Sequence, residues 1–173
     1  MERRDGAWAG LRLLAVGILA VAMVPSGAAQ DADVHMNNGF AAAAVRGAVG
    51  GARRRLTRES CLNLLREFKD TEGHTLQANL EARHRTAEAQ LRALQFEDGI
   101  SCRLCDKNGI HALTRAGSSV VYICSDAFLT AYRRNPYLAE SYIIHELLHT
   151  LGLGENPPSS QEITDRVVEA CHN

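Results

Sequence analysis

Two histidines stand four residues apart in the C-terminal third of the chain, within the stretch His145-Glu146-Leu147-Leu148-His149. On an α-helix, side chains with this spacing lie on one face, so both imidazoles can bind the same metal ion. A zinc ion held by three protein groups keeps one water molecule and lowers its pKa from about 15.7 towards about 7. Glu146 would lie beside that water and could accept its proton. The spacing therefore predicts metal-assisted hydrolysis.

The residues around this motif predict that it lies inside a single helix. Asn135 is followed by Pro136, and an N-cap residue before a proline at the first helical position is typical of a helix start. Gly152 follows the last apolar turn, where a left-handed glycine commonly ends a helix. We therefore expect a helix from about Pro136 to Leu151 that is apolar on most sides and buries both histidines.

The motif and the residues after it resemble a known signature. The series His145, Glu146, His149, Gly152, Glu155 is similar to the HExxHxxGxxH pattern of metzincins, a branch of the zincin family of zinc metallopeptidases. The resemblance implies that His145, His149 and Glu155 bind zinc and that Glu146 is the general base. It also implies a sharp turn at Gly152 that returns the third ligand to the metal. The chain departs from the pattern in having glutamate at the last position and no methionine after the motif.

Acidic residues further along the chain are alternatives for the third ligand, because the gluzincin branch takes a glutamate from the next helix. Ser159 and Glu162 have the spacing of a capping box, which would give Glu162 a structural role. Asp165 and Glu169 share the polar side of the same expected helix, and Glu169 is the better candidate of the two. We expect Glu155 to be the ligand. The alternatives are one of these three residues, or a site without a third protein ligand.

The first 29 residues have the pattern of a secretory signal peptide. Basic residues precede an apolar run from Leu13 to Val24, and small residues stand before Gln30. The run is short for a membrane span, so a retained anchor is the alternative. We expect a secreted or periplasmic protein without stable membrane insertion after cleavage. The net charge of −1 does not indicate a nucleic-acid partner.

All of the cysteines lie beyond the predicted signal peptide, and an oxidising compartment favours disulfide bonds. We expect Cys61 to pair with Cys171, and either Cys102 or Cys105 to pair with Cys124. One cysteine would then be unpaired. A zinc ribbon is not indicated, because the CxxC motif has no second CxxC as a partner.

Residues 30–56 are rich in alanine, glycine and arginine and have no sustained apolar period, which predicts a flexible linker. Helical spacing begins at Thr57, the expected N-cap of a helix that Gly73 would end. A second helical region, residues 76–94, is expected to break near His84.

Two apolar segments, residues 110–113 and 120–124, lie between turn sequences and predict a short sheet. Helices, a small sheet, the motif helix and a final helix together predict an α+β fold in one domain, residues 57–173. This order resembles a small zincin domain, in which a sheet packs on the active-site helix. In zincins an edge strand above the metal pairs with an extended substrate, and the resemblance implies that role for Val120 to Cys124.

These features predict a secreted zinc metallopeptidase that acts on peptide or protein substrates, with Glu146 as the general base. The group that would stabilise the oxyanion stays unassigned. The candidates before or within the motif helix are Tyr122, Tyr137 and Tyr142, and after the motif only His172 remains, near the chain end. The alternative function is a secreted metal-binding module of the cell envelope without catalysis.

Overall fold

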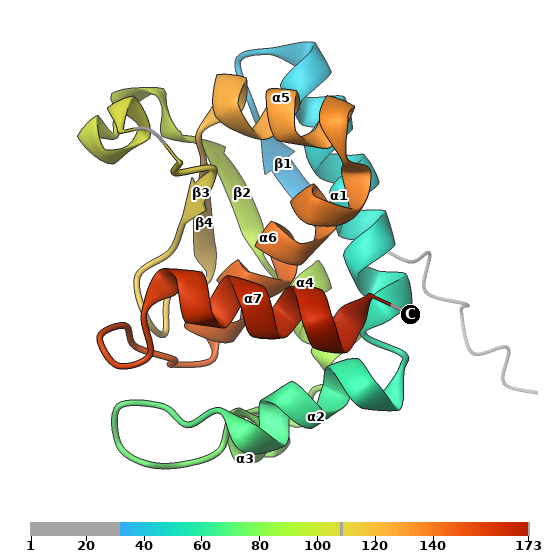
Figure 1. Ribbon diagram of the computed structural model, residues 1–173, viewed down its shortest axis with the longest axis vertical. Coiled ribbons are helices and arrows are strands. Elements are labelled where there is room, and N and C mark those ends of the chain that lie inside the picture. Colours follow the sequence, from blue (N-terminus) through green and yellow to red (C-terminus); the bar gives the residue numbers. More distant parts are fainter. Residues whose placement is uncertain (1–31, 108, 173) are drawn as a thin grey trace, which may run out of the picture.

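The computed structural model describes residues 32–107 and 109–172 (Figure 1). Over these residues the fold is α+β, as expected, with seven α-helices and a four-stranded sheet. The predicted signal peptide, residues 1–29, lies outside the described residues. Within the described part, no helix combines the length and apolar character needed to cross a bilayer.

The sheet has the strand order β1-β2-β4-β3. Its strands are β1 (Asp33–His35), β2 (Gln95–Asp98), β3 (Ala112–Leu113) and β4 (Val120–Ile123). β1 and β4 both run parallel to β2, and β3 runs antiparallel to β4. The two expected strands are thus confirmed as β3 and β4. The expectation that residues 120–124 form an edge is wrong, because β2 pairs with the far side of β4 and leaves β3 at the edge.

The helices are α1 (Gly39–Arg55), α2 (Glu59–Glu67), α3 (Leu76–Ala82), α4 (Ala87–Arg92), α5 (Ser125–Arg134), α6 (Pro136–Thr150) and α7 (Ser160–Cys171). α6 is the central helix, and α1, α5 and α7 all pack against it (Figure 1). It confirms the predicted motif helix and ends at Thr150 with Leu151 as its C-cap. The predicted break near His84 is also confirmed, because it separates α3 from α4.

The expected start and end of the first helical segment are both wrong. The N-cap of α2 is Arg58, while the Thr57 hydroxyl donates a hydrogen bond to the Arg54 carbonyl at the end of α1. The Thr57 side chain is therefore already used by the preceding helix. Gly73 lies in the loop after α2, with a φ of +92°, and α2 ends before it.

The interpretation of residues 30–56 as a flexible linker is also wrong, because they contain β1 and α1. The small side chains of α1 belong to the same hydrophobic core as the rest of the chain. Added Cβ atoms at Gly47 and Gly51 would lie 2.2 Å from the Tyr132 hydroxyl and 2.1 Å from Glu140 Cδ. The helix therefore packs through close backbone approach. Alanine and glycine contribute little to an apolar period, so the sequence pattern did not predict it.

Two disulfide bonds join distant parts of the fold. Cys61 in α2 is bonded to Cys171 in α7, and Cys105 is bonded to Cys124. Both predictions are confirmed, and the choice between Cys102 and Cys105 is decided. Cys102 is the free thiol among the described residues.

Candidate metal site

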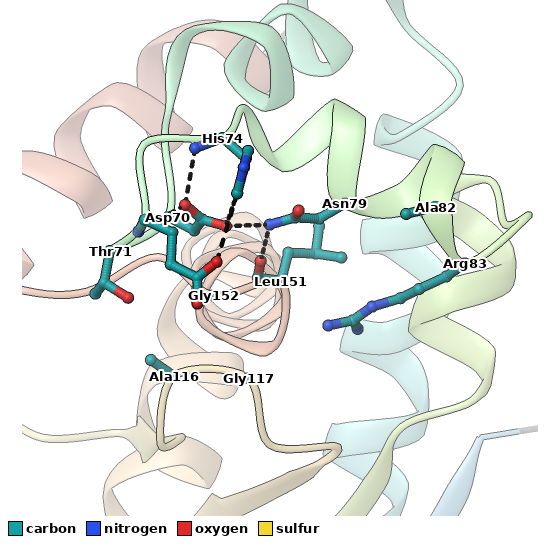
Figure 2. Close-up of a pocket in the computed structure, with 11 residues that line it drawn as sticks. Asp70, Thr71, His74, Asn79, Ala82, Arg83, Ala116, Gly117, Leu151 and Gly152 are labelled. Atoms are coloured by element: carbon teal, nitrogen blue, oxygen red, sulfur yellow. Dashed lines mark hydrogen bonds and ion pairs between the residues drawn. The ribbon is translucent and has the colours of Figure 1, made fainter.

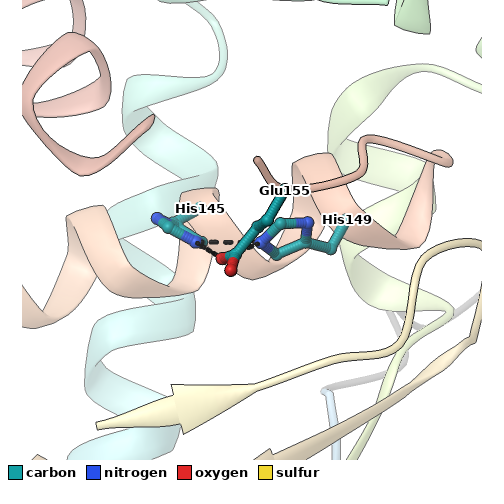
Figure 3. A group of neighbouring side chains, drawn as sticks. All are labelled: His145, His149 and Glu155. Atoms are coloured by element: carbon teal, nitrogen blue, oxygen red, sulfur yellow. Dashed lines mark hydrogen bonds and ion pairs between the residues drawn. The ribbon is translucent and has the colours of Figure 1, made fainter. Parts of the chain in front are cut away.

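Two histidines of α6 and one glutamate of the following loop point towards one another (Figure 3). The Nε2 atoms of His145 and His149 lie 3.0 Å apart. Glu155 Oε1 lies 3.3 Å from His149 Nε2 and 3.8 Å from His145 Nε2. Ligand atoms around a tetrahedral zinc ion with bonds of about 2.0–2.1 Å lie roughly 3.3 Å from one another. The three side chains therefore fit a divalent metal ion by both chemistry and spacing.

The remaining ring nitrogens of both histidines have partners outside α6. His149 Nδ1 lies 2.8 Å from the Leu153 carbonyl, which can only accept, so Nδ1 carries the proton and Nε2 offers a lone pair. His145 Nδ1 lies 3.0 Å from Thr164 Oγ1 in α7. Partners of this kind orient metal-binding imidazoles. Neither group was predicted from the sequence. The available signal was Thr164, a polar residue next to the buried Ile163 of α7.

The protonation state of His145 suits metal binding. Its side chain is nearly buried, and burial together with the neighbouring His149 lowers its pKa from 6.5 to about 3. A histidine must be neutral to donate a lone pair to a metal ion. His145 is therefore ready to bind a cation at neutral pH without first losing a proton.

The end of α6 is anchored from outside, and this anchoring positions the loop that carries Glu155. Gly152 follows the helix with a φ of +104°, a conformation that glycine tolerates best. Three carbonyl groups in the last turn of α6 accept hydrogen bonds from other parts of the chain. The pairs are Gly117 N with His149 O at 2.8 Å, Arg83 Nη1 with Thr150 O at 3.3 Å, and Asn79 Nδ2 with Leu151 O at 2.9 Å.

A hollow of about 450 Å³ lies beside this turn (Figure 2). In it, Asn79 donates a hydrogen bond of 2.8 Å to Asp70, and the backbone amides of Glu72 and His74 donate to the same carboxylate. The bond from Asn79 and these amide contacts lower the pKa of Asp70 from 3.8 to about 2. The ionised carboxylate thereby orients Asn79 towards the end of α6. None of the three candidate ligands lines this hollow, so its role in the site is to support the turn.

Glu146 is buried next to the candidate ligands. Its Oε2 atom has no hydrogen-bond partner in the described part of the chain. Burial, with a further contribution from Glu155, raises the pKa of Glu146 from 4.5 to about 8, and the Thr114 hydroxyl partly opposes this shift. That hydroxyl forms no hydrogen bond of ordinary geometry. A buried carboxylate oxygen without a partner is costly, and such groups occur where a protein needs them for binding or catalysis.

The alternative acidic ligands lie elsewhere. Glu162 and Ser159 form the expected capping box at the start of α7. Asp165 accepts a hydrogen bond from Gln161 on the surface of that helix. Neither of these carboxylates, nor that of Glu169, belongs to the cluster of possible metal ligands found among the described residues.

The aromatic candidates for oxyanion stabilisation are placed differently from one another. Tyr137 donates a hydrogen bond to a backbone carbonyl of α7 and contacts His172 edge to face. Tyr122 is exposed on β4. The ring of Tyr142 stacks on that of His111, with centroids 4.3 Å apart. Of the three tyrosines, Tyr142 lies on the same side of α6 as the two metal-site histidines.

Comparisons of this chain with protein-family models, with curated proteins and with solved structures give no match.

Proposed function

We propose that this protein is a zinc-dependent peptidase whose zinc is held by His145, His149 and Glu155. Two imidazoles and one carboxylate form the ligand set of catalytic zinc in several peptidases, where water takes the fourth position. The observation that carries the proposal is that these three side chains converge beside Glu146, a buried carboxylate with an unpaired oxygen. A structural zinc site normally has a cysteine or histidine as its fourth ligand. The cluster among the described residues has three members and no fourth ligand of either kind.

Zinc bound there would polarise a substrate carbonyl and make water acidic enough to be deprotonated near neutral pH. Glu146 then accepts the proton of the attacking water and passes it to the leaving amine. Burial raises its affinity for a proton, and the positive charge of bound zinc would favour the ionised carboxylate, which is the form that can accept a proton. Thr164 and the Leu153 carbonyl keep the two imidazoles in position, so the ligand set need not reorganise during the reaction.

We also propose that the protein acts outside the cytoplasm. The two disulfide bonds support this location, because such bonds persist in oxidising compartments. The sequence pattern of residues 1–29 supports it independently.

The proposal is tested with Glu146→Gln, which keeps the size of the side chain and removes the proton acceptor. Zinc content is measured by elemental analysis, and cleavage of a mixed peptide library is followed by mass spectrometry. We expect the variant to retain zinc and to cleave about 10²–10⁴-fold more slowly than the wild type.

Equal cleavage by the two proteins would reject Glu146 as the base. Zinc bound without cleavage by either protein would support the alternative of a metal-binding module. Absence of bound zinc after reconstitution would reject the proposed site itself.

A further inference from the structure

The side of α6 that carries the candidate ligands continues towards the start of the helix into a second hollow, of about 570 Å³. Leu138 of α6 lines this hollow. It stands two helical turns before His145, so both side chains project from the same side of the helix. Tyr142 lies between them, and its partner in the ring stack, His111, also lines the hollow.

The lining of this hollow is apolar at its floor and polar at its rim. Ala127 and Ala131 of α5, together with Leu138, contribute the apolar surface. The exposed residues at the edges are polar, namely Asp126, Thr130, Arg134 and Asn135. Burial lowers the pKa of His111, so its ring is neutral at pH 7 and adds a flat aromatic wall. A cavity of this size has room for one large side chain, with its apolar part against the floor and water at the polar rim.

The distance between the hollow and the metal site corresponds to about three residues of an extended peptide. The rise between Leu138 and His145 along α6 is about 10 Å, since each helical residue advances about 1.5 Å. An extended peptide advances about 3.3 Å per residue. β3 packs beside α6 and forms one edge of the sheet, so a peptide paired with that edge would lie beside α6. A residue about three positions from the scissile bond would reach the hollow.

We infer that this hollow is a substrate subsite, which binds a large aliphatic or aromatic side chain about three residues from the scissile bond. The inference rests on the proposed peptidase function. It assigns substrate selection to α5 and to the pair formed by His111 and Tyr142, at a distance from the residues that carry the chemistry.

The test uses two tryptophan substitutions on exposed positions of α5. Thr130→Trp places a large ring in the hollow, because Thr130 lines it. Arg133→Trp adds the same ring on the same helix outside the hollow and is the matched control. Cleavage sites in a mixed peptide library are first aligned on the scissile bond. Two peptides that differ only by phenylalanine or alanine at the preferred third position are then compared.

For the wild type and Arg133→Trp we expect kcat/KM to be about tenfold higher for the phenylalanine peptide than for the alanine peptide. This ratio is at the lower end of the discrimination that an apolar pocket gives. For Thr130→Trp we expect the two peptides to be cleaved about equally. The Kd values of both peptides are also measured by fluorescence anisotropy on zinc-loaded Glu146→Gln, with and without Thr130→Trp. This second readout does not require catalysis.

Cleavage without a preference at the third position, or with the same preference in both tryptophan variants, would overturn the subsite and leave the peptidase proposal intact. Another outcome is that the protein cleaves neither peptide but binds the phenylalanine peptide, and that Thr130→Trp weakens this binding. This result would support the subsite and reject the peptidase. If the peptides are neither bound nor cleaved, both proposals are rejected.

Discussion

Thr164 Oγ1 in α7 lies 3.0 Å from Nδ1 of His145 in α6, although the two residues are 19 positions apart in the chain. This contact orients the imidazole of a candidate ligand from a separate helix. It therefore makes the packing of α7 against α6 part of the proposed metal site.

Removal of the Thr164 hydroxyl is expected to weaken zinc binding. Loss of such an outer partner typically costs 10–100-fold in metal affinity, so we expect a Kd about 10–100-fold higher for Thr164→Val. Thr164→Ser keeps the hydroxyl and should bind zinc nearly as the wild type does. Titration against a chromophoric chelator measures both variants. Equal affinity of Thr164→Val and the wild type would contradict the positioning role.

Glu155 and Glu169 are expected to differ in their effect on zinc content. Glu155→Ala removes one of the three converging ligand atoms, whereas Glu169 lies outside the cluster. After gel filtration, elemental analysis should find little zinc in Glu155→Ala and about the wild-type amount in Glu169→Ala. The opposite result would place the third ligand on α7.

Gly152→Ala is expected to damage both stability and zinc binding. The new side chain would stand at a φ of +104°, with its Cβ 3.0 Å from Asp70 Cβ, and strain of this kind costs about 1–3 kcal/mol. Gly73→Ala is the matched control, because Gly73 also has a positive φ but no atom near the added Cβ. Urea denaturation should show both variants destabilised, and chelator titration should show weaker zinc binding for Gly152→Ala alone. Unchanged zinc affinity in Gly152→Ala would show that this turn does not position Glu155.

The ion pair between Arg55 and Glu140 is expected to stabilise the fold. The pair has a separation of 2.5 Å with side chains 17% and 11% exposed, and Arg55 also donates to the Cys171 carbonyl. Arg55→Met leaves a buried carboxylate unpaired and should lower the free energy of unfolding by about 3 kcal/mol.

The more exposed pair of Arg53 and Glu88 provides the control for this measurement. Arg53→Met should cost less than about 1 kcal/mol in the same urea titration. Similar losses in the two methionine variants would mean that burial of the ion pair is unimportant for stability.

Acid is expected to destabilise the protein partly through Asp70. The pKa of this carboxyl in the folded chain is about 2, below its ordinary value of 3.8, chiefly because Asn79 donates to it. Its contribution to stability is therefore present above about pH 4 and is lost as the pH falls from about 4 to 2. Asp70→Asn should show a shallower fall in the urea midpoint over that interval. Identical pH profiles for the wild type and the variant would contradict the assignment.

Several local features could be predicted from the sequence because neighbouring residues determine them. The start of α6 at Pro136 follows from proline at the first helical position, and its end follows from a left-handed glycine at position 152. The capping box of α7 depends on residues three positions apart. Each of these patterns acts within one or two helical turns, so the linear order of residues contains them.

The contribution of α1 to the core could not be predicted in this way. Most of its buried positions hold alanine or glycine, whose small side chains give a weak apolar period even though they allow close helix packing. Its burial depends on Tyr132 and Glu140, which come from α5 and α6 and lie far away in the chain. Likewise, β4 became an inner strand because β2, from another part of the sequence, pairs with it.

At the metal site, the positions of His145 and His149 on one side of a helix follow from their spacing of four residues. Glu146 stands next to them in the same turn. Three other features of the site depend on the folding of the whole chain: Glu155 turns back to the histidines, Thr164 and the Leu153 carbonyl orient their rings, and the other acidic residues lie outside the cluster. The two groups of features differ in how far along the chain the responsible interactions act. Periodicity and capping act over a few residues, whereas the convergence of side chains depends on the path of the whole chain and on the packing of α7 against α6.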